Sequence, residues 1–331
     1  MKYEILVGNC LDTLKTLKDK SVNCCVTSPP YFGLRDYGTA EWEGGNPDCD
    51  HIDPYQNRGQ NTYMQSTNNN GQGTSTWKVC KKCGAKRIDE QIGLEESPED
   101  FINTMVKVFR EVKRVLRDDG TLWLNLGDTY DNNKNLLGIP FRTALALQQD
   151  GWYLRQDIIW HKPNPMPESV RDRCTKSHEY IFLLSKSSKY YYDHEAIKEN
   201  SVNPEATKKR LEKPCMTGPK HESGGYSAIG AKHTAGIKKF DGKRNKRSVW
   251  IVNTKPYKEA HFATYPVKLI EPCILAGCPV GGTVLDPFGG AGTTALVANQ
   301  NNRNAILCEL NERYVDIIKH RLSGLQMSLN M

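Results

Sequence analysis

The chain has 331 residues, of which 38% are hydrophobic and 25% charged, and this balance predicts a packed core rather than a disordered chain. The formal net charge of +7 permits a polyanionic partner without requiring one. No apolar run approaches the roughly 18 residues of a membrane span, and the opening MKYEILVGNC lacks the apolar stretch of a signal peptide, so we expect a cytoplasmic protein.

Two short apolar strands are predicted near the start of the chain, at 3–9 and 22–28. Between them, residues 10–19 have leucines at helical spacing and predict a helix. Residues 39–90 then lose all hydrophobic periodicity and are rich in Asn, Gln, Gly and Thr, which predicts an insert in the fold.

The insert contains two pairs of residues with zinc-ligand spacing, Cys49-x-His51 and Cys80-x-x-Cys83. A glycine follows the second pair, and VCKKCGAKR is typical of one half of a zinc ribbon. The alternative is four unrelated reduced side chains in a loop, and the C-x-H pair is the weaker half of the pattern. We predict that the four side chains form a structural zinc site.

Strands and helices alternate after the insert. A helix is expected from Ser97, a good N-cap residue followed by proline, along an apolar stripe. Further segments follow in chain order: a strand at 121–127, a helix at 138–151, strands at 152–162 and 178–187, a helix at 262–278, and a strand–helix–strand–helix series from 283 to the end. This alternation predicts an α/β fold with a doubly wound, mostly parallel sheet.

Residues 198–247 form a second irregular region, with thirteen Lys and Arg against five Asp and Glu. Such a segment is either a solvated loop or a surface that contacts phosphates. The candidate phosphate contacts are Lys208, Lys209, Arg210, Lys238, Lys239, Arg244 and Arg247.

The clearest cofactor signal is TVLDPFGGAGTTALVANQ. A predicted strand runs into Gly289, Gly290 and Gly292, and a helix begins near Thr293. Glycines let the backbone approach a ligand closely, and a helix start offers unpaired N–H groups to a carboxylate or phosphate. Glu309, at the end of the next predicted strand, can accept hydrogen bonds from ribose hydroxyls.

Gly290-x-Gly292-x-x-Ala295 also matches a dehydrogenase pattern, but only about 20 residues follow Glu309. A nicotinamide-binding domain needs several more strand–helix units after that acid. Those units must come from the N-terminal part of the chain. The sequence therefore predicts a permuted sheet whose cofactor-binding half comes last.

Thr27-Ser28-Pro29-Pro30-Tyr31 lies where the second predicted strand ends, and ligands of open α/β sheets bind beyond such strand ends. The two prolines fix the path of the backbone and lack N–H donors, which leaves the nearby carbonyl groups as acceptors. With a serine hydroxyl and a stacking ring beside them, the turn suits a planar base that carries an amino group. A sulfonium methyl donor in the neighbouring pocket would permit direct transfer to that nitrogen.

Taken together, TSPPY at 27–31 and DPFGGAGTT at 286–294 resemble the motifs of AdoMet-dependent DNA amino-methyltransferases. Their order, catalytic motif first, is similar to the β-class arrangement. EVKRVLRDDGTLWLNLGD, IIWHKPNPMPESVRDRCTKSHEYIFLLSK and HFATYPVKLIEPCI resemble the intermediate motifs of that family. The resemblance implies a Rossmann-like methyltransferase sheet, S-adenosyl-L-methionine (AdoMet) as cofactor and double-stranded DNA as partner.

Matched by position, the resemblance implies that the target base is held by Ser28, Pro29, Pro30 and Tyr31. It implies AdoMet contacts by Asp286, Phe288, Gly289, Gly290, Gly292, Thr293 and Thr294, with Glu309 on the ribose. Residues near the AdoMet carboxylate would be Phe262, Thr264, Tyr265 and Pro266. VGNCLDTL matches the segment that contacts adenine; there the family usually has an acidic residue, and this chain has Asn9 and Cys10.

Ser28 bears on the choice of base, because family members with serine at this position mostly methylate cytosine N4. Those with Asp or Asn mostly methylate adenine N6. The resemblance therefore implies N4 methylation of a flipped-out cytosine, with N6-adenine methylation as the alternative. An RNA or protein amide methyltransferase is disfavoured by the basic segment and the insert, and a non-catalytic DNA-binding module by the glycine loop.

The predicted domains are a catalytic half at 1–38 and 91–195, the insert at 39–90, a basic target-recognition region at 196–248, and an AdoMet-binding half at 249–331. We expect the insert and the basic region to read bases that flank the target, in the major groove. A homodimer and a cognate restriction endonuclease are both compatible with the resemblance.

Overall fold

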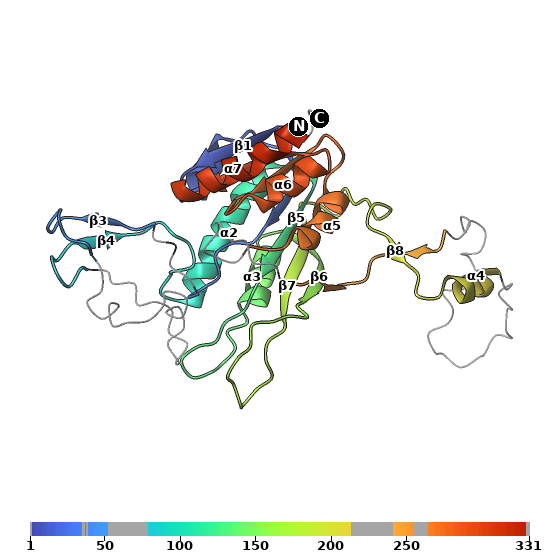
Figure 1. Ribbon diagram of the computed structural model, residues 1–331, viewed down its shortest axis with the longest axis horizontal. Coiled ribbons are helices and arrows are strands. Elements are labelled where there is room, and N and C mark those ends of the chain that lie inside the picture. Colours follow the sequence, from blue (N-terminus) through green and yellow to red (C-terminus); the bar gives the residue numbers. More distant parts are fainter. Residues whose placement is uncertain are drawn as a thin grey trace. The chain divides into compact units, whose positions relative to one another are not determined.

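The computed structural model of the protein describes residues 2–34, 37, 39–51, 79–212, 241–254 and 264–328 (Figure 1). Contacts within the chain divide it into two units. The larger comprises Met1–Asp193 and Ser248–Met331, and the smaller comprises His194–Arg247. Residues 39–90 group with the larger unit in this division.

The larger unit is built on an eight-stranded sheet in the order β1-β12-β11-β2-β5-β7-β6-β10. The strands are β1 Tyr3–Val7, β2 Val22–Thr27, β5 Leu116–Leu126, β6 Tyr153–His161, β7 His178–Ser185, β10 Val249–Ile251, β11 Thr283–Asp286 and β12 Asn304–Glu309. Every neighbouring pair is parallel except that β7 runs antiparallel to both β5 and β6. The predicted mostly parallel sheet is confirmed.

Helices cover both faces of this sheet, as alternating side chains of the central strands demonstrate. Cys25 and Leu122 belong to the buried cluster that includes the apolar face of α2. The adjacent residues Cys24 and Trp123 face the other way and lie against Gly277 of α5, with no room there for a side chain on that glycine. The helices of the larger unit are α1 Cys10–Thr13, the 3-10 helix η1 Leu14–Thr16, α2 Pro98–Val115, α3 Ile139–Gln149, α5 Val267–Gly277, α6 Thr293–Gln300 and α7 Glu312–Ser328.

Helix α2 follows its sequence signals closely. The Ser97 side chain accepts a hydrogen bond from the Asp100 amide at 3.1 Å, and proline occupies the first turn. Its apolar stripe is fully buried and forms a large part of the core: Phe101, Met105, Val108, Val112 and Val115.

The helix predicted at 10–19 is shorter than expected, because α1 and η1 end at Thr16. Leu17 has an extended backbone, and the Arg114 guanidinium donates to the carbonyl oxygens of Leu14 and Leu17. An arginine from α2 thus satisfies carbonyl groups that a longer helix would have bonded internally.

The insert has a small antiparallel sheet of its own, in which β3 (Glu41–Glu43) pairs with β4 (Lys86–Ile88). Sequence periodicity does not reveal these strands, since each has only three residues. Most of the Asn- and Gln-rich stretch, residues 52–78, lies outside the described residues.

The smaller unit contains β8 (Glu199–Asn200) paired antiparallel with β9 (Lys243–Arg244), and helix α4 (Pro204–Glu212). Two of the arginines predicted to contact phosphates bind an acid within the unit. Arg244 and Arg247 donate to the same Glu199 carboxylate oxygen, at 3.0 and 2.8 Å. Lys208 is exposed, the side chains of Lys209 and Arg210 are not described, and Lys238 and Lys239 lie outside the described residues.

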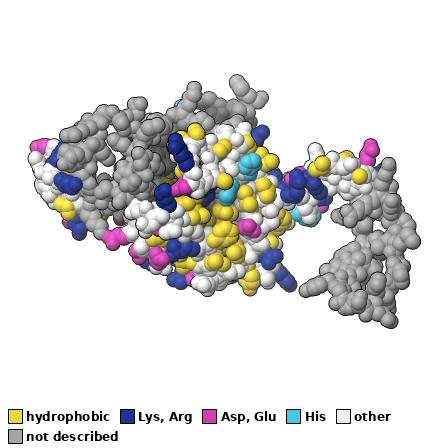
Figure 2. All heavy atoms as spheres, turned by 90° about the horizontal axis from the view of Figure 1, so that it is seen from below, with side chains coloured by type: hydrophobic (Ala, Val, Ile, Leu, Met, Phe, Trp, Pro, Cys, Tyr) yellow, Lys and Arg dark blue, Asp and Glu magenta, His cyan; other side chains and the backbone are white. Residues whose placement is uncertain are grey.

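Within the described part of the chain, no helix combines the length and the apolar character needed to cross a membrane. Figure 2 shows hydrophobic side chains gathered in the middle of one face, with Lys and Arg side chains around them. Two exposed apolar residues, Leu136 and Met166, follow β5 and β6 in the chain. Because β2, β5 and β6 point the same way, these residues follow strand ends at the same sheet edge as the turn at Ser28.

Candidate active site

The two principal motifs meet at the carboxyl ends of adjacent strands. β2 ends at Thr27 and β11 ends at Asp286, and the two strands pair in parallel at the centre of the sheet. The Thr27 hydroxyl donates a hydrogen bond of 2.6 Å to Asp286 Oδ1. The fold thus joins segments separated by 259 residues, as the permuted order predicts.

Asp286 is the centre of a buried hydrogen-bond network. Its second oxygen, Oδ2, accepts from the Thr294 hydroxyl at 2.5 Å and from the Tyr265 hydroxyl at 2.8 Å. The Phe288 amide adds a bond of 3.1 Å to Oδ1. Burial raises the pKa of this carboxyl to about 6, against the lowering effect of its donors. Asp286 therefore links both motifs and the start of α5 from below the glycine loop.

Tyr31 is held by an acid that sequence reasoning did not identify. Its hydroxyl donates to Glu179 Oε2 at 2.6 Å, and the Ser28 hydroxyl lies 3.4 Å from the tyrosine oxygen. Glu179, on β7, also accepts from Asn125 Nδ2 at 3.1 Å and from Lys162 Nζ. Burial and the neighbouring carboxylate raise the phenol pKa well above its usual value, so Tyr31 stays neutral.

Two glycines make room for this turn. A Cβ at Gly127, directly after β5, would lie 2.5 Å from Cε2 and 2.9 Å from Cδ2 of the Tyr31 ring. A Cβ at Gly93, whose φ is +101°, would lie 3.1 Å from the Tyr31 carbonyl oxygen and 3.2 Å from Pro30 Cβ. The catalytic turn is therefore packed between β5 and the chain that leaves the insert.

The glycine loop packs against β12 and α7. Gly292 is the N-cap of α6 with φ +73°, and a Cβ there would lie 3.0 Å from Ile318 on α7. Gly289 donates its amide to the Cys308 carbonyl at 2.8 Å, and Gly290 has φ +49°. Glycine is thus required here for close packing and left-handed backbone.

The threonines that follow the loop are both buried. Thr294 bonds Asp286, and Thr293 accepts from Arg321 Nη1 at 2.9 Å. Arg321, on α7, also donates to the Ala291 carbonyl at 2.9 Å. The arginine supports the loop from the last helix, and no sequence motif points to it.

Glu309 ends β12 and faces the glycine loop. Its Oε2 accepts from the Gly290 amide at 2.7 Å and its Oε1 from the Asn311 amide at 2.9 Å. Burial is the largest cause that raises the pKa of this carboxyl to about 7. Each oxygen keeps a lone pair for a further donor, because a carboxylate can accept about four hydrogen bonds.

The segment predicted to contact adenine begins α1. Asn9 caps this helix by accepting from the Leu11 amide at 3.0 Å, and its Nδ2 donates to Glu90 Oε2 at 3.2 Å. Asn9 and Glu90 line a pocket of about 350 Å³. Cys10 is 6% exposed and belongs to the hydrophobic core, where burial raises its thiol pKa to about 12.

The other predicted cofactor residues lie at the start of α5. Tyr265 bonds Asp286, as described, and Thr264 is half-buried beside it in the chain. Pro266 is buried and is the N-cap residue of α5. Phe262 lies outside the described residues.

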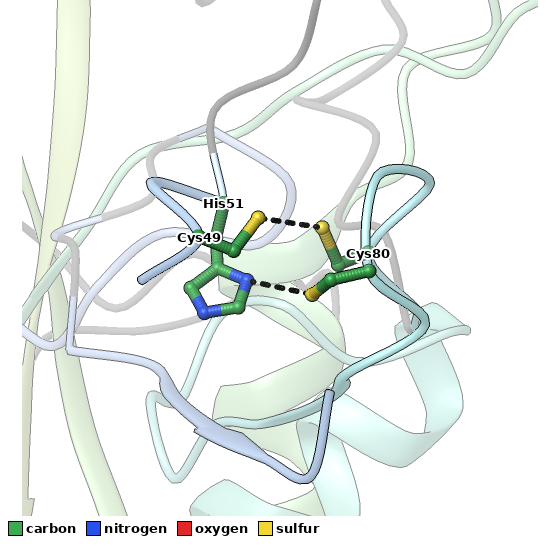
Figure 3. A group of neighbouring side chains, drawn as sticks. Cys49, His51 and Cys80 are labelled. Atoms are coloured by element: carbon green, nitrogen blue, oxygen red, sulfur yellow. Dashed lines mark hydrogen bonds between the residues drawn. The ribbon is translucent and has the colours of Figure 1, made fainter. Parts of the chain in front are cut away.

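The four predicted metal ligands come together in the insert. The ligand atoms of Cys49, His51, Cys80 and Cys83 all lie within 4.8 Å of one another (Figure 3).

Comparison with known proteins agrees with this geometry. A family model described as DNA methylase, N6_N4_Mtase, matches residues 22–320. The chain is 41% identical to the type II methyltransferase M.Cfr9I of Citrobacter freundii, over 96% of this chain and 86% of that protein. It is 38% identical to the type II methyltransferase M.SmaI of Serratia marcescens, over 96% of this chain and 90% of that protein.

Solved structures share the fold. The PvuII DNA methyltransferase, described as cytosine-N4-specific, superposes with a TM-score of 0.59 at 15% identity, over 98% of this chain and 94% of that one. A DNA modification methylase of Thermus thermophilus, TTHA0409, solved with S-adenosyl-L-methionine, gives 0.55 at 19% identity, over 98% and 95%.

Proposed function

The chain belongs to the N6/N4 DNA methylase family, and from this premise we propose that it methylates the exocyclic N4 of a flipped-out cytosine in double-stranded DNA. AdoMet is the methyl donor. The observation that carries the proposal is the bond between Thr27 and Asp286, which joins the serine–proline–tyrosine turn to the glycine loop. Base and methyl donor would then occupy adjacent positions at one sheet edge.

The turn supplies what an amino nitrogen needs as a nucleophile. The Ser28 hydroxyl and a backbone carbonyl would accept the two amino hydrogens, and the Tyr31 ring would stack on the base. These acceptors hold the nitrogen close to tetrahedral geometry while it attacks the sulfonium methyl group. AdoMet leaves as the neutral thioether, and the proton released from the nitrogen passes to an acceptor or to water.

On the cofactor side, the Glu309 carboxylate would accept from the ribose hydroxyls. Glu90 lies at the place where the family usually has an acid, and it would accept from the adenine amino group in place of Asn9. Both assignments are supported by the bonds that orient these acids, from Gly290 and Asn311 to Glu309 and from Asn9 to Glu90.

Cytosine is preferred to adenine because of Ser28, the residue that is mostly Asp or Asn in N6-adenine enzymes. The fold likeness to an enzyme described as cytosine-N4-specific agrees with this choice. N6-adenine methylation is the second candidate, since both reactions use the same turn. The type II relatives also favour a cognate restriction endonuclease as partner and a cytoplasmic location.

The reaction class is tested by incubating the full chain with isotopically labelled AdoMet and equal amounts of duplex DNA, structured RNA or a glutamine-containing peptide. We expect label in the duplex DNA alone. Label in RNA or peptide but not in DNA would overturn the proposal. Binding of DNA without any transfer of label would favour a non-catalytic module.

Gly127 to Ala is expected to lower kcat by about tenfold or more, since the new methyl group would displace the Tyr31 ring by a fraction of an ångström. The affinity for AdoMet should stay within about twofold, because Gly127 does not contact the glycine loop. Steady-state kinetics and calorimetry measure the two quantities. An unchanged kcat would show that the ring position does not limit the reaction.

The affinity for AdoMet is expected to rise with pH through about 7. Because the folded-state pKa of Glu309 is raised, ionising this acid costs stability in the free protein as pH rises through that value. Ribose hydroxyls that bond the carboxylate recover this cost, so binding favours the ionised form. Kd should be about tenfold weaker at pH 6 than at pH 8.

The matched variant is Glu309 to Gln, which cannot titrate. Its Kd for AdoMet should be weaker than that of the wild type at pH 8 and nearly independent of pH between 6 and 8. Calorimetry at several pH values gives both curves. The same pH dependence in both proteins would rule out Glu309 as its source.

A further inference from the structure

We propose that the insert holds one structural zinc ion, bound by Cys49 Sγ, His51 Nδ1, Cys80 Sγ and Cys83 Sγ. This site goes beyond the methyl-transfer reaction, which uses none of the four residues. Cys80 is buried and the other three are partly buried, so the group is enclosed by the insert itself (Figure 3).

The distances match a tetrahedron of zinc ligands. Zinc binds thiolate at about 2.3 Å and imidazole at about 2.0–2.1 Å, so tetrahedral angles place two sulfurs about 3.8 Å apart and a sulfur and a nitrogen about 3.6 Å apart. The Cys49 and Cys80 sulfurs are 3.8 Å apart, and Cys83 Sγ is 3.6 Å from His51 Nδ1. A disulfide would need about 2.05 Å, which excludes a bond between Cys49 and Cys80 in this arrangement.

The backbone shapes the second ligand pair as a knuckle. The Gly84 amide donates to the Cys80 carbonyl at 2.8 Å, and the Cys80 amide donates to the Ala85 carbonyl at 2.7 Å. Gly84 has φ +76°, a conformation that turns the chain tightly after the second cysteine. A Cβ on Gly45 would lie 2.8 Å from Cys83 Sγ, so that glycine leaves the space which the sulfur occupies.

The imidazole is oriented before any metal is considered. The His51 ring stacks on Trp42 of β3, with 4.5 Å between ring centroids and 9° between planes. His51 also has φ +49°, a conformation that non-glycine residues adopt rarely and retain where their surroundings hold them. Packing and backbone together point Nδ1 at the three sulfurs, which is the preorganisation that a metal site needs.

The position of the site indicates its role. One pair of ligands follows β3 and the other precedes β4, so the metal would close the chain segment between them and hold the two strands together. Closing such a loop by a metal removes conformational freedom from the unfolded chain.

The far end of β4 leads directly to the active site. Asp89 binds Arg87 and the Thr39 hydroxyl, and next to it Glu90 accepts from Asn9. The Gly93 carbonyl then accepts from the Gly33 amide at 2.8 Å, beside the catalytic turn. Zinc at one end of the hairpin would thus steady the residues that wall the pocket at its other end.

The test is the metal content of the full chain, purified from medium that contains zinc and measured by plasma mass spectrometry. We expect about one zinc per chain for the wild type and for Cys174 to Ser, which changes an exposed cysteine outside the group. Cys83 to Ser should lose most of the zinc and unfold at a temperature roughly 5 °C lower.

A second measurement on the wild type removes any dependence on a variant that fails to fold. Cobalt(II) exchanged into the protein should give thiolate-to-cobalt charge-transfer absorption and the intense visible bands of a tetrahedral site. Wild type without zinc and without this spectrum, full zinc retention by Cys83 to Ser, or iron in place of zinc would each overturn the assignment. Methyl transfer by the wild type is measured separately, so a failed zinc site leaves the methylase proposal standing.

Discussion

Tyr31 to Ala is expected to lower kcat for methyl transfer by about 100-fold or more while the affinity for AdoMet changes little. Loss of the stacking ring removes about 1–3 kcal/mol of base contact, and a flipped base left loosely held would be displaced from the methyl group. Steady-state kinetics on a duplex substrate and calorimetry with AdoMet measure the two effects.

Tyr31 to Phe is the matched control, because it keeps the ring and removes only the bond to Glu179. We expect a loss of roughly tenfold, since Asn125 and Lys162 still satisfy the Glu179 carboxylate. If phenylalanine lowered kcat as much as alanine does, the hydroxyl rather than the ring would be the essential feature. If neither variant changed kcat, the turn would not hold the base.

Asp286 to Ala is expected to abolish detectable AdoMet binding and to lower the free energy of unfolding by about 3 kcal/mol or more. The carboxylate is buried and accepts from Thr27, Tyr265, Thr294 and the Phe288 amide. Removing it leaves several buried donors without an acceptor, and each unsatisfied group costs about 1–3 kcal/mol. Urea unfolding at pH 8, where a carboxyl with a pKa of about 6 is ionised, gives the change in stability.

Thr27 to Val is the matched control for this network, since it removes one donor and keeps the shape of the side chain. It should cost about 1 kcal/mol and leave AdoMet binding measurable. Equal losses in the two variants would mean that Asp286 acts only through Thr27. Wild-type stability in Asp286 to Ala would contradict the central place given to this carboxylate.

The strands, the permuted order and the two principal motifs could be predicted because their signals are local. β2 and β11 have continuous apolar runs, and each ends in a motif whose prolines or glycines can be recognised by sequence alone. The apolar stripe of α2 likewise has helical spacing that is visible in the sequence.

The supporting residues could not be predicted, because their roles arise from contacts between distant segments. Glu179 lies 148 positions from the tyrosine hydroxyl that it accepts from, and its neighbours in sequence read as an ordinary strand. Gly127 resembles a turn residue until the Tyr31 ring is placed beside it. Glu90 becomes a pocket residue only because the end of the insert returns to Asn9.

Cys10 shows the converse case, in which a matched motif position is a core residue. Position alone made it a cofactor candidate, but its side chain packs inward from the first turn of α1. Side-chain direction at a helix start depends on how the helix docks, and a four-residue helix gives too little periodicity to predict this from sequence.

The central claim is that the turn at Ser28–Tyr31 and the loop at Asp286–Thr294 form one site that methylates cytosine N4. The most direct measurement is mass spectrometry of nucleosides from plasmid DNA grown with this protein in a host that lacks DNA methylation. We predict N4-methylcytosine with the wild type and none with Tyr31 to Ala. N6-methyladenine in place of N4-methylcytosine, or the same modification with both proteins, would contradict the account.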